Sequence, residues 1–284
     1  EKTVAVIADE VNRSPWCIGA FVDNEKSWGL TNGPVDRKYA LILDALSLDA
    51  KESPAKEFFT SELKRKYLKI EALNSAWGLD LKSWDEFQKS ISLNKFSEPM
   101  VADFSMMLRL YGDQYFRIVH AEMKKHLPNH LYLGAWMARW GMPKEVVEAA
   151  IKYVDVLSFN NYDYGVQSTG WEFFESIDRP AIIGEFHIGT TQGSGMYHPG
   201  LIAASSQKDR ARLYKRYLES VTSHPNFVGV HWFQYTDQPL TGRAYDGQNA
   251  NIGFVNVADI PYPEMVEAAR QINTNLYPQR LSDQ

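Results

Sequence analysis

From residue 130 onward, short apolar segments alternate with longer amphipathic ones, and this alternation restricts the fold more than any other feature of the 284-residue sequence. The apolar segments suit strands buried on both faces, and the amphipathic ones suit helices that cover a sheet. Such a repeat predicts a parallel sheet with crossover helices. The expected strands, including an earlier one near the N-terminus, are 16–22, 130–136, 154–159, 181–186 and 227–233. The expected helices are 3–11, 53–76, 84–87, 99–126, 143–153, 171–177, 206–223 and 263–276.

Polar and aromatic side chains collect where the expected strands end. In a (β/α)8 barrel these ends face one mouth, where the chemistry takes place. A doubly wound open sheet is the alternative fold, but it predicts a Gly-rich nucleotide loop after the first strand, and the sequence has none. The residues at the strand ends are Asn24, Glu25, Trp136, Arg139, Asn160, Tyr162, Glu185, His187, Trp232 and Gln234.

The expected strands are too few for a complete barrel, which needs eight. Five strands are expected, and about 15 residues before the first are too few for three βα units of roughly 30 residues each. Residues 1–284 are therefore predicted to cover strands four to eight of an α/β (β/α)8 TIM barrel, with a helical insertion at about 30–127. An N-terminal segment of the same protein, or another fragment, is expected to supply strands one to three, because five strands alone leave a sheet edge exposed.

Composition excludes several classes of partner. The net charge is −5 and no basic block occurs, which argues against nucleic acid. No apolar run reaches membrane-spanning length, and Cys17 is the only cysteine, so an intrachain disulfide is excluded. No spacing of His and acidic residues resembles a metal site, and we expect no metal and no cofactor. Aromatic residues make up 13% of the chain, which suits either core packing or a cleft with flat faces for a sugar.

Two glutamates carry the candidate chemistry. Glu185 ends the apolar run 181–184, and Glu25 follows the strand 16–22. A charge at the end of a buried strand is costly unless it is hydrogen-bonded or functional. Each glutamate alone is compatible with a salt-bridged strand end, but two carboxylates across a sugar can cleave a glycosidic bond. If the mechanism is retaining, the two carboxyl groups should lie roughly 5–5.5 Å apart.

Neighbouring residues fit a sugar site. The Asn24 amide can hydrogen-bond the 2-hydroxyl of the sugar, Tyr162 can donate its phenol to Glu185, and Trp232 can form a stacking floor. For His187, substrate contact and packing are both open. Arg139 is compatible with a sugar hydrogen bond or with a surface ion pair. The further residues predicted to bind substrate are Trp136, Asn160 and Gln234.

The motifs Asp23-Asn24-Glu25 and Gly184-Glu185-Phe186 resemble the fourth- and seventh-strand motifs of clan A glycoside hydrolases. The closer resemblance is to family 50 β-agarases, and it covers nearly the whole chain. It rests on residues 21–29, 131–134, 154–160 and 231–235. Family 42, which is galactosidase-like, shares the Asp-Asn-Glu strand, so a β-galactosidase-like enzyme and a non-catalytic carbohydrate-binding fragment stay open as alternatives.

The resemblance implies the roles of the two glutamates. Glu25 would be the acid/base and Glu185 the nucleophile of a retaining glycosidase. The substrate would be agarose or its oligosaccharides, cleaved at β-1,4 bonds with release of neoagarobiose. The protein is expected to be secreted or periplasmic in a bacterium, with the export signal outside these residues.

Overall fold

The computed structural model describes residues 2–166, 171 and 177–282. The chain divides into two compact units, Glu1–Asp155 and Val156–Gln284, which are called the first and second unit below. Each is described by itself. Within the described residues, no helix is both long and apolar enough to cross a membrane.

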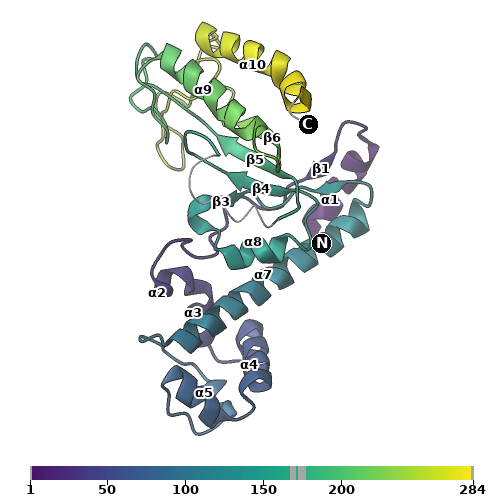
Figure 1. The fold of residues 1–284 in the computed structure, drawn as a ribbon, viewed down its shortest axis with the longest axis vertical. Helices are drawn as coiled ribbons and strands as arrows, with labels where there is room; N and C mark the ends of the chain where they lie inside the picture. Colours follow the sequence, from purple (N-terminus) through teal and green to yellow (C-terminus); the bar gives the residue numbers. More distant parts are fainter. Residues whose placement is uncertain (1, 167–170, 172–176, 283–284) are drawn as a thin grey trace. The chain divides into compact units, whose positions relative to one another are not determined.

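The first unit contains a short parallel sheet. Strand β1 (Gly19–Ala20) pairs with β2 (Leu131–Tyr132), although these residues lie more than 100 positions apart in the sequence. A side chain at Gly19 would bring its Cβ within 2.4 Å of the Leu131 carbonyl oxygen, so the close approach of the strands requires glycine. Helix α1 (Lys2–Arg13) contacts α7 (Glu98–His126), as Figure 1 shows.

Helices fill the predicted insertion. Besides α7 they are α2 (Val35–Lys38), α3 (Ala40–Ser47), α4 (Pro54–Tyr67), α5 (Ile70–Trp77) and α6 (Trp84–Phe87). Serine side chains cap three of these helices, since Ser53, Ser83 and Ser97 each accept a bond from the backbone N–H three residues later. The caps and the N1 prolines are visible in the sequence, whereas α2 and α3 were not predicted.

The single helix expected over 53–76 is wrong, because the backbone breaks at Leu68. Leu68 has φ 63°, outside the helical region, and it separates α4 from α5. The fully buried carboxylate of Asp103 on α7 holds the two pieces. It accepts bonds from Tyr67 Oη (2.7 Å) and Trp77 Nε1 (2.8 Å) and pairs with Lys66 (2.5 Å). Three donors on one buried acid offset the conformational strain of the break.

The last part of the first unit comprises β3 (Met137–Ala138), a 3-10 turn at Arg139–Gly141 and helix α8 (Lys144–Ala150). Helix α8 packs on α7 at Gly112, where an added Cβ would meet that of Ala149 at 3.2 Å. The strand expected over 130–136 extends for only two residues. Gly134 (φ 85°) and Trp136 (φ 38°) turn the backbone out of the extended region, so the pairing with β1 stops there.

In the described part of the second unit, three parallel strands form the sheet. They are β4 (Leu157–Asn160), β5 (Ala181–Phe186) and β6 (Phe227–Trp232), adjacent in that order. Helix α9 (Gln207–Thr222), capped by Ser206, packs on β6, and α10 (Pro263–Ser282) packs on α9 (Figure 1). These strands and helices confirm the second half of the predicted alternation. The helix expected over 171–177 lies largely outside the described residues.

Candidate active site

Glu185 lies near the carboxyl end of β5 and is only 8% exposed. Its Oε2 accepts a hydrogen bond of 2.6 Å from the phenol of Tyr162, which follows β4. The hydrogen bond predicted between these two residues is therefore present. In the β4–β5 register Asn160 is the partner of Glu185, and its side chain is buried as well. The second unit thus brings together three of the residues expected at the site.

Helix α9 holds the turn that carries Tyr162 through hydrogen bonds between Tyr217 and Asn161. The Asn161 amide donates to Gly165 O (3.2 Å) and to Tyr217 Oη (2.9 Å), and Tyr217 Oη donates to the Asn161 carbonyl (2.8 Å). The Tyr217 ring stacks on Phe186, with centroids 4.0 Å apart. Because Phe186 directly follows Glu185, Tyr217 fixes both the strand end and the turn. Tyr217 lies within the helix predicted over 206–223, and the sequence pattern alone does not distinguish it from the other apolar positions of that helix.

His187 is a neutral ring that packs against the ring of Tyr162. It is 3% exposed, and its ring centroid is 4.7 Å from that of Tyr162. Burial lowers its pKa to about 3, and the charges of Arg210 and Arg243 act in the same direction. Its Nε2 accepts the backbone N–H of Leu201 at 2.8 Å, which assigns the proton of the neutral ring to Nδ1. The ring therefore supports Tyr162 without adding a charge near Glu185.

The pKa of His187 predicts a loss of stability in acid. The unfolded chain takes up a proton at this ring near pH 6.5, whereas the folded chain does so only near pH 3. Between these values acid favours unfolding, by at most about 1.4 kcal/mol for each pH unit. We expect His187→Gln, whose amide can still accept the Leu201 N–H, to flatten the decline of unfolding free energy with falling pH. Urea denaturation between pH 4 and 8 measures this, and identical pH slopes in both proteins would contradict it.

Trp232 and Gln234 lie at and after the end of β6. The Trp232 indole donates to Ile252 O (2.8 Å) and packs edge-on against Phe186 and Tyr214, on the side of the sheet that α9 covers. These contacts show that the Trp232 ring packs within the protein. Its predicted role, stacking against a sugar ring, stays a prediction. The Gln234 amide donates to Thr236 O (3.1 Å), and the Phe233–Gln234 peptide bond is cis.

In the first unit, Asn24 and Glu25 lie in a turn with unusual backbone angles. Asp23 (φ 69°), Glu25 (φ 51°) and Trp136 (φ 38°) all have positive φ although none is glycine. The turn is bonded to the segment after β2, since Glu25 N–H donates to Trp136 O (3.1 Å). Positive φ at non-glycine residues costs about 1–3 kcal/mol each and is concentrated at functional sites. Asn24 is exposed and Glu25 half-buried.

A tyrosine on α7 holds this turn from the other side. Tyr115 Oη donates a short hydrogen bond to Asp23 Oδ2, and its ring packs edge-on against buried Trp28. The ring of Trp136 packs against Phe21, with centroids 4.9 Å apart. Tyr115 lies within the helix predicted over 99–126, and no local signal in the sequence distinguishes it. The first unit thus brings Asn24, Glu25 and Trp136 together.

Arg139 begins the 3-10 turn after β3 and is half-buried. Its carbonyl accepts a hydrogen bond of 2.6 Å from Thr31 Oγ1. The backbone at Arg139 is therefore tied to the segment after the Asn24-Glu25 turn, while a sugar contact of the guanidinium stays a prediction. Within the described residues, no group of three or more His, Cys, Asp and Glu side chains is arranged to hold a metal ion.

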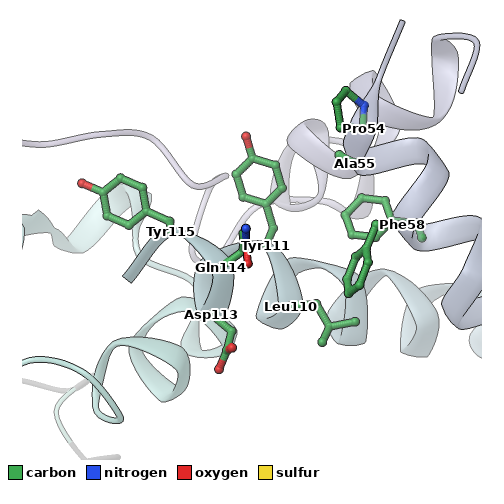
Figure 2. A pocket seen from close by; sticks show the side chains of 9 residues that line it. Pro54, Ala55, Phe58, Leu110, Tyr111, Asp113, Gln114 and Tyr115 are labelled. Carbon is green, nitrogen blue, oxygen red and sulfur yellow. The ribbon is translucent and has the colours of Figure 1, made fainter. Parts of the chain in front are cut away.

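An open pocket of about 490 Å³ lies in the first unit between α4 and α7 (Figure 2). Phe58, Tyr111 and Tyr115 line it with aromatic rings. Asp113 points away from Tyr111 in this view and accepts bonds from Lys152 (2.7 Å) and Tyr153 (2.9 Å). Because Tyr115 also bonds Asp23, the pocket adjoins the turn that carries Glu25. Aromatic rings of this kind suit the apolar face of a sugar.

No protein-family model matches the chain. Two curated proteins of Vibrio sp. (strain JT0107) match it along most of its length. β-Agarase B is 49% identical over 271 residues, which are 94% of this chain and 28% of that protein. β-Agarase A is 43% identical over 272 residues, which are 92% of this chain and 27% of that protein. The chain therefore spans less than a third of the length of these relatives.

Solved structures agree with these matches. The structure of an exo-β-agarase superposes with a TM-score of 0.95 at 49% identity, covering 99% of this chain and 38% of the other. A β-galactosidase of Halorubrum lacusprofundi superposes with a TM-score of 0.60 at 15% identity, covering 94% of this chain and 39% of the other, which is a likeness of fold alone. The fold is thus the α/β fold of a class of glycosidases. Within that class, the chain is similar over nearly its whole length to a segment of the family 50 β-agarases.

Proposed function

We propose that this chain forms the catalytic part of a retaining β-agarase that hydrolyses β-1,4 bonds in agarose or neoagaro-oligosaccharides and releases neoagarobiose. The observation that carries the proposal is the buried carboxylate of Glu185 at a strand end, with one oxygen held by Tyr162 at 2.6 Å. The relatives named as β-agarases support the substrate class. The strained Asn24-Glu25 turn supports a functional role for the second glutamate.

In the first step of the proposed reaction, Glu185 attacks the anomeric carbon through one carboxylate oxygen. The glycosidic C–O bond breaks, and its electron pair goes to the leaving oxygen, which takes a proton from Glu25. A covalent glycosyl–enzyme forms. Tyr162 binds the other oxygen of Glu185, so it keeps the attacking oxygen oriented and the carboxylate ionised.

In the second step, Glu25 removes a proton from water, the water oxygen bonds to the anomeric carbon, and Glu185 leaves as the free carboxylate. Two displacements at the same carbon restore its original configuration. Asn24, next to the acid/base, is placed in this scheme on the 2-hydroxyl of the sugar. The separation of about 5–5.5 Å that this mechanism requires between the two carboxyl groups stays a prediction.

We also propose that the chain corresponds to strands four to eight of a (β/α)8 barrel and that another segment or fragment completes it. In the described part of the chain, β1 is paired in a two-stranded sheet with β2. Next to it, Trp16 and Ile18 are 88% and 70% exposed. Large apolar side chains beside a short sheet edge favour a covering segment. A stable, monomeric 32.5 kDa species by intact-mass and sizing measurements would contradict this proposal.

The activity is tested with the chain and with the complete polypeptide that contains it. Agarose, neoagaro-oligosaccharides and nitrophenyl β-galactoside are compared side by side, with products identified by mass and by anomeric NMR. We expect neoagarobiose in the β configuration as the first product. Cleavage of the galactoside alone would instead favour a β-galactosidase-like enzyme, and an α product would contradict retention.

A non-catalytic role is the second candidate for the isolated chain. It is favoured by the observation that the chain spans only 28% and 27% of the two curated relatives. Neoagaro-oligosaccharide binding by the chain, without any product, together with turnover by the complete polypeptide, would assign binding to this segment and catalysis to the whole protein.

A further inference from the structure

The loop after β6 presents an aromatic ring to solvent beside an arginine. Tyr245 is 78% exposed. The guanidinium carbon of Arg243 lies 4.6 Å from the centroid of the Tyr245 ring and 5.9 Å from that of Phe233. The cation therefore lies near both aromatic rings, where each contact stabilises it. One surface of Tyr245 is supported by protein, and much of the rest is free for a ligand.

Arg243 is itself held firmly. Its guanidinium donates to both carboxylate oxygens of Asp246, at 3.1 and 2.5 Å, and to Gln248 Oε1 at 2.8 Å. The Arg243 side chain is only 17% exposed. Gln248 Oε1 also accepts a bond from fully buried Gln238. This bonding leaves the guanidinium little rotational freedom, so it is a fixed support against which the ring of Tyr245 packs.

The backbone of the loop is closed by its own hydrogen bonds. Arg243 N–H donates to Gln248 O, and Gly247 N–H donates to Arg243 O, both at 2.8 Å. Gly242 has φ 85°, and an added Cβ there would lie 2.5 Å from the Gly247 carbonyl oxygen. The tight turn requires glycine at this position. The ring is thus presented by a rigid loop, which keeps the entropy cost of binding low.

A continuous row of side chains joins this ring to Glu185. Tyr162 bonds Glu185, and the ring of His187 lies 4.7 Å from that of Tyr162. The centroid of Phe233 is 6.2 Å from that of His187, and Arg243 lies between Phe233 and Tyr245. All these residues belong to the second unit. Tyr162, His187 and Phe233 come directly after the carboxyl ends of β4, β5 and β6 or within two residues of them. Tyr245 therefore lies outward from the proposed nucleophile, several side chains away.

We propose that Tyr245, supported by Arg243, is a stacking platform for a sugar residue of the substrate that lies away from the bond being cleaved. The C–H-bearing face of a galactose ring, or the bicyclic 3,6-anhydro sugar, presents an apolar surface that matches an exposed aromatic face. Binding energy gained on a distant sugar holds the oligosaccharide in place while the reacting sugar is distorted. This inference rests on the proposed agarase function and adds the residue that favours longer substrates.

The test compares Tyr245→Ala with Tyr245→Phe in the complete polypeptide. We expect Tyr245→Ala to lower kcat/KM for long neoagaro-oligosaccharides by roughly 5- to 30-fold, with little change for the shortest oligosaccharide that is cleaved. Tyr245→Phe keeps the aromatic face and should retain most of the activity. Arg243→Met should give an intermediate loss, mainly through KM, because the ring is then less well oriented.

A matched control is Tyr277→Ala, since Tyr277 on α10 is exposed to a similar extent, 75%. This variant should have the same kcat/KM as the wild type for every substrate. Calorimetry of oligosaccharide binding to the Glu185→Gln protein, with and without Tyr245→Ala, measures the platform independently of turnover. If the wild type cleaves neoagaro-oligosaccharides and Tyr245→Ala has the same kcat/KM at every oligosaccharide length, the proposal of a stacking platform is wrong. If the wild type neither cleaves nor binds them, the proposed function itself fails.

Discussion

Glu185→Gln should lower the hydrolysis of neoagaro-oligosaccharides by at least about 10⁴-fold, because the amide cannot form the glycosyl–enzyme. The fold should persist, since Gln has the same shape and its side-chain oxygen can still accept the Tyr162 phenol. In Glu185→Ala, small anions such as azide or formate can occupy the space of the lost carboxylate and attack the anomeric carbon. We expect either anion to restore activity, and azide to yield a glycosyl azide of inverted configuration.

A surface glutamate provides the control for this experiment. Glu148 on α8 pairs with Arg109 at 2.6 Å and is 45% exposed. Glu148→Ala should keep full activity and show no response to azide. A well-folded Glu185→Ala protein that azide and formate cannot rescue would argue against the nucleophile role. Thermal unfolding of each variant establishes that loss of activity does not reflect loss of structure.

Glu25→Ala should have an effect that depends on the leaving group. For an oligosaccharide, whose leaving alkoxide needs a proton, we expect kcat/KM to fall by roughly 10²–10⁴-fold, the range of general acid catalysis. For dinitrophenyl β-galactoside, whose leaving group needs no proton, the first step should change little. The second step lacks its base, so the glycosyl–enzyme should accumulate, and azide should accelerate turnover with retained configuration.

These patterns separate the two glutamates. Azide gives an inverted product with Glu185→Ala and a retained product with Glu25→Ala, because it replaces the nucleophile in the first and the activated water in the second. Asp23→Asn serves as a comparison within the same turn. It weakens the bond from Tyr115 and should reduce activity on the oligosaccharide more than the first step on the dinitrophenyl galactoside, as Glu25→Ala does but less strongly, through poorer positioning of Glu25. Equal losses on both substrates in Glu25→Ala would contradict an acid/base role.

Long, well-capped elements were predictable from sequence. The helices expected over 99–126 and 206–223 are found as Glu98–His126 and Gln207–Thr222, and the strand 181–186 is found as expected. Serine caps and long apolar periodicity fix such elements locally. The break at Leu68 was not predictable, because three donors from α4 and α5 to buried Asp103 decide it. The short β1 and β2 depend in the same way on backbone turns that the sequence pattern does not reveal.

Sequence alone pointed to the two candidate carboxylates and to the place of Glu185 at a strand end, because an acid that follows an apolar run is visible in the local order of residues, whereas the turn that carries Asn24 and Glu25 was not predicted. The sequence also predicted the bond from Tyr162 to Glu185. Tertiary structure alone decided what holds these groups: Tyr217 beneath Phe186, the neutral His187 behind Tyr162, and Tyr115 on Asp23. Such contacts join residues far apart in sequence. They arise from strand order and helix packing, which no local periodicity encodes.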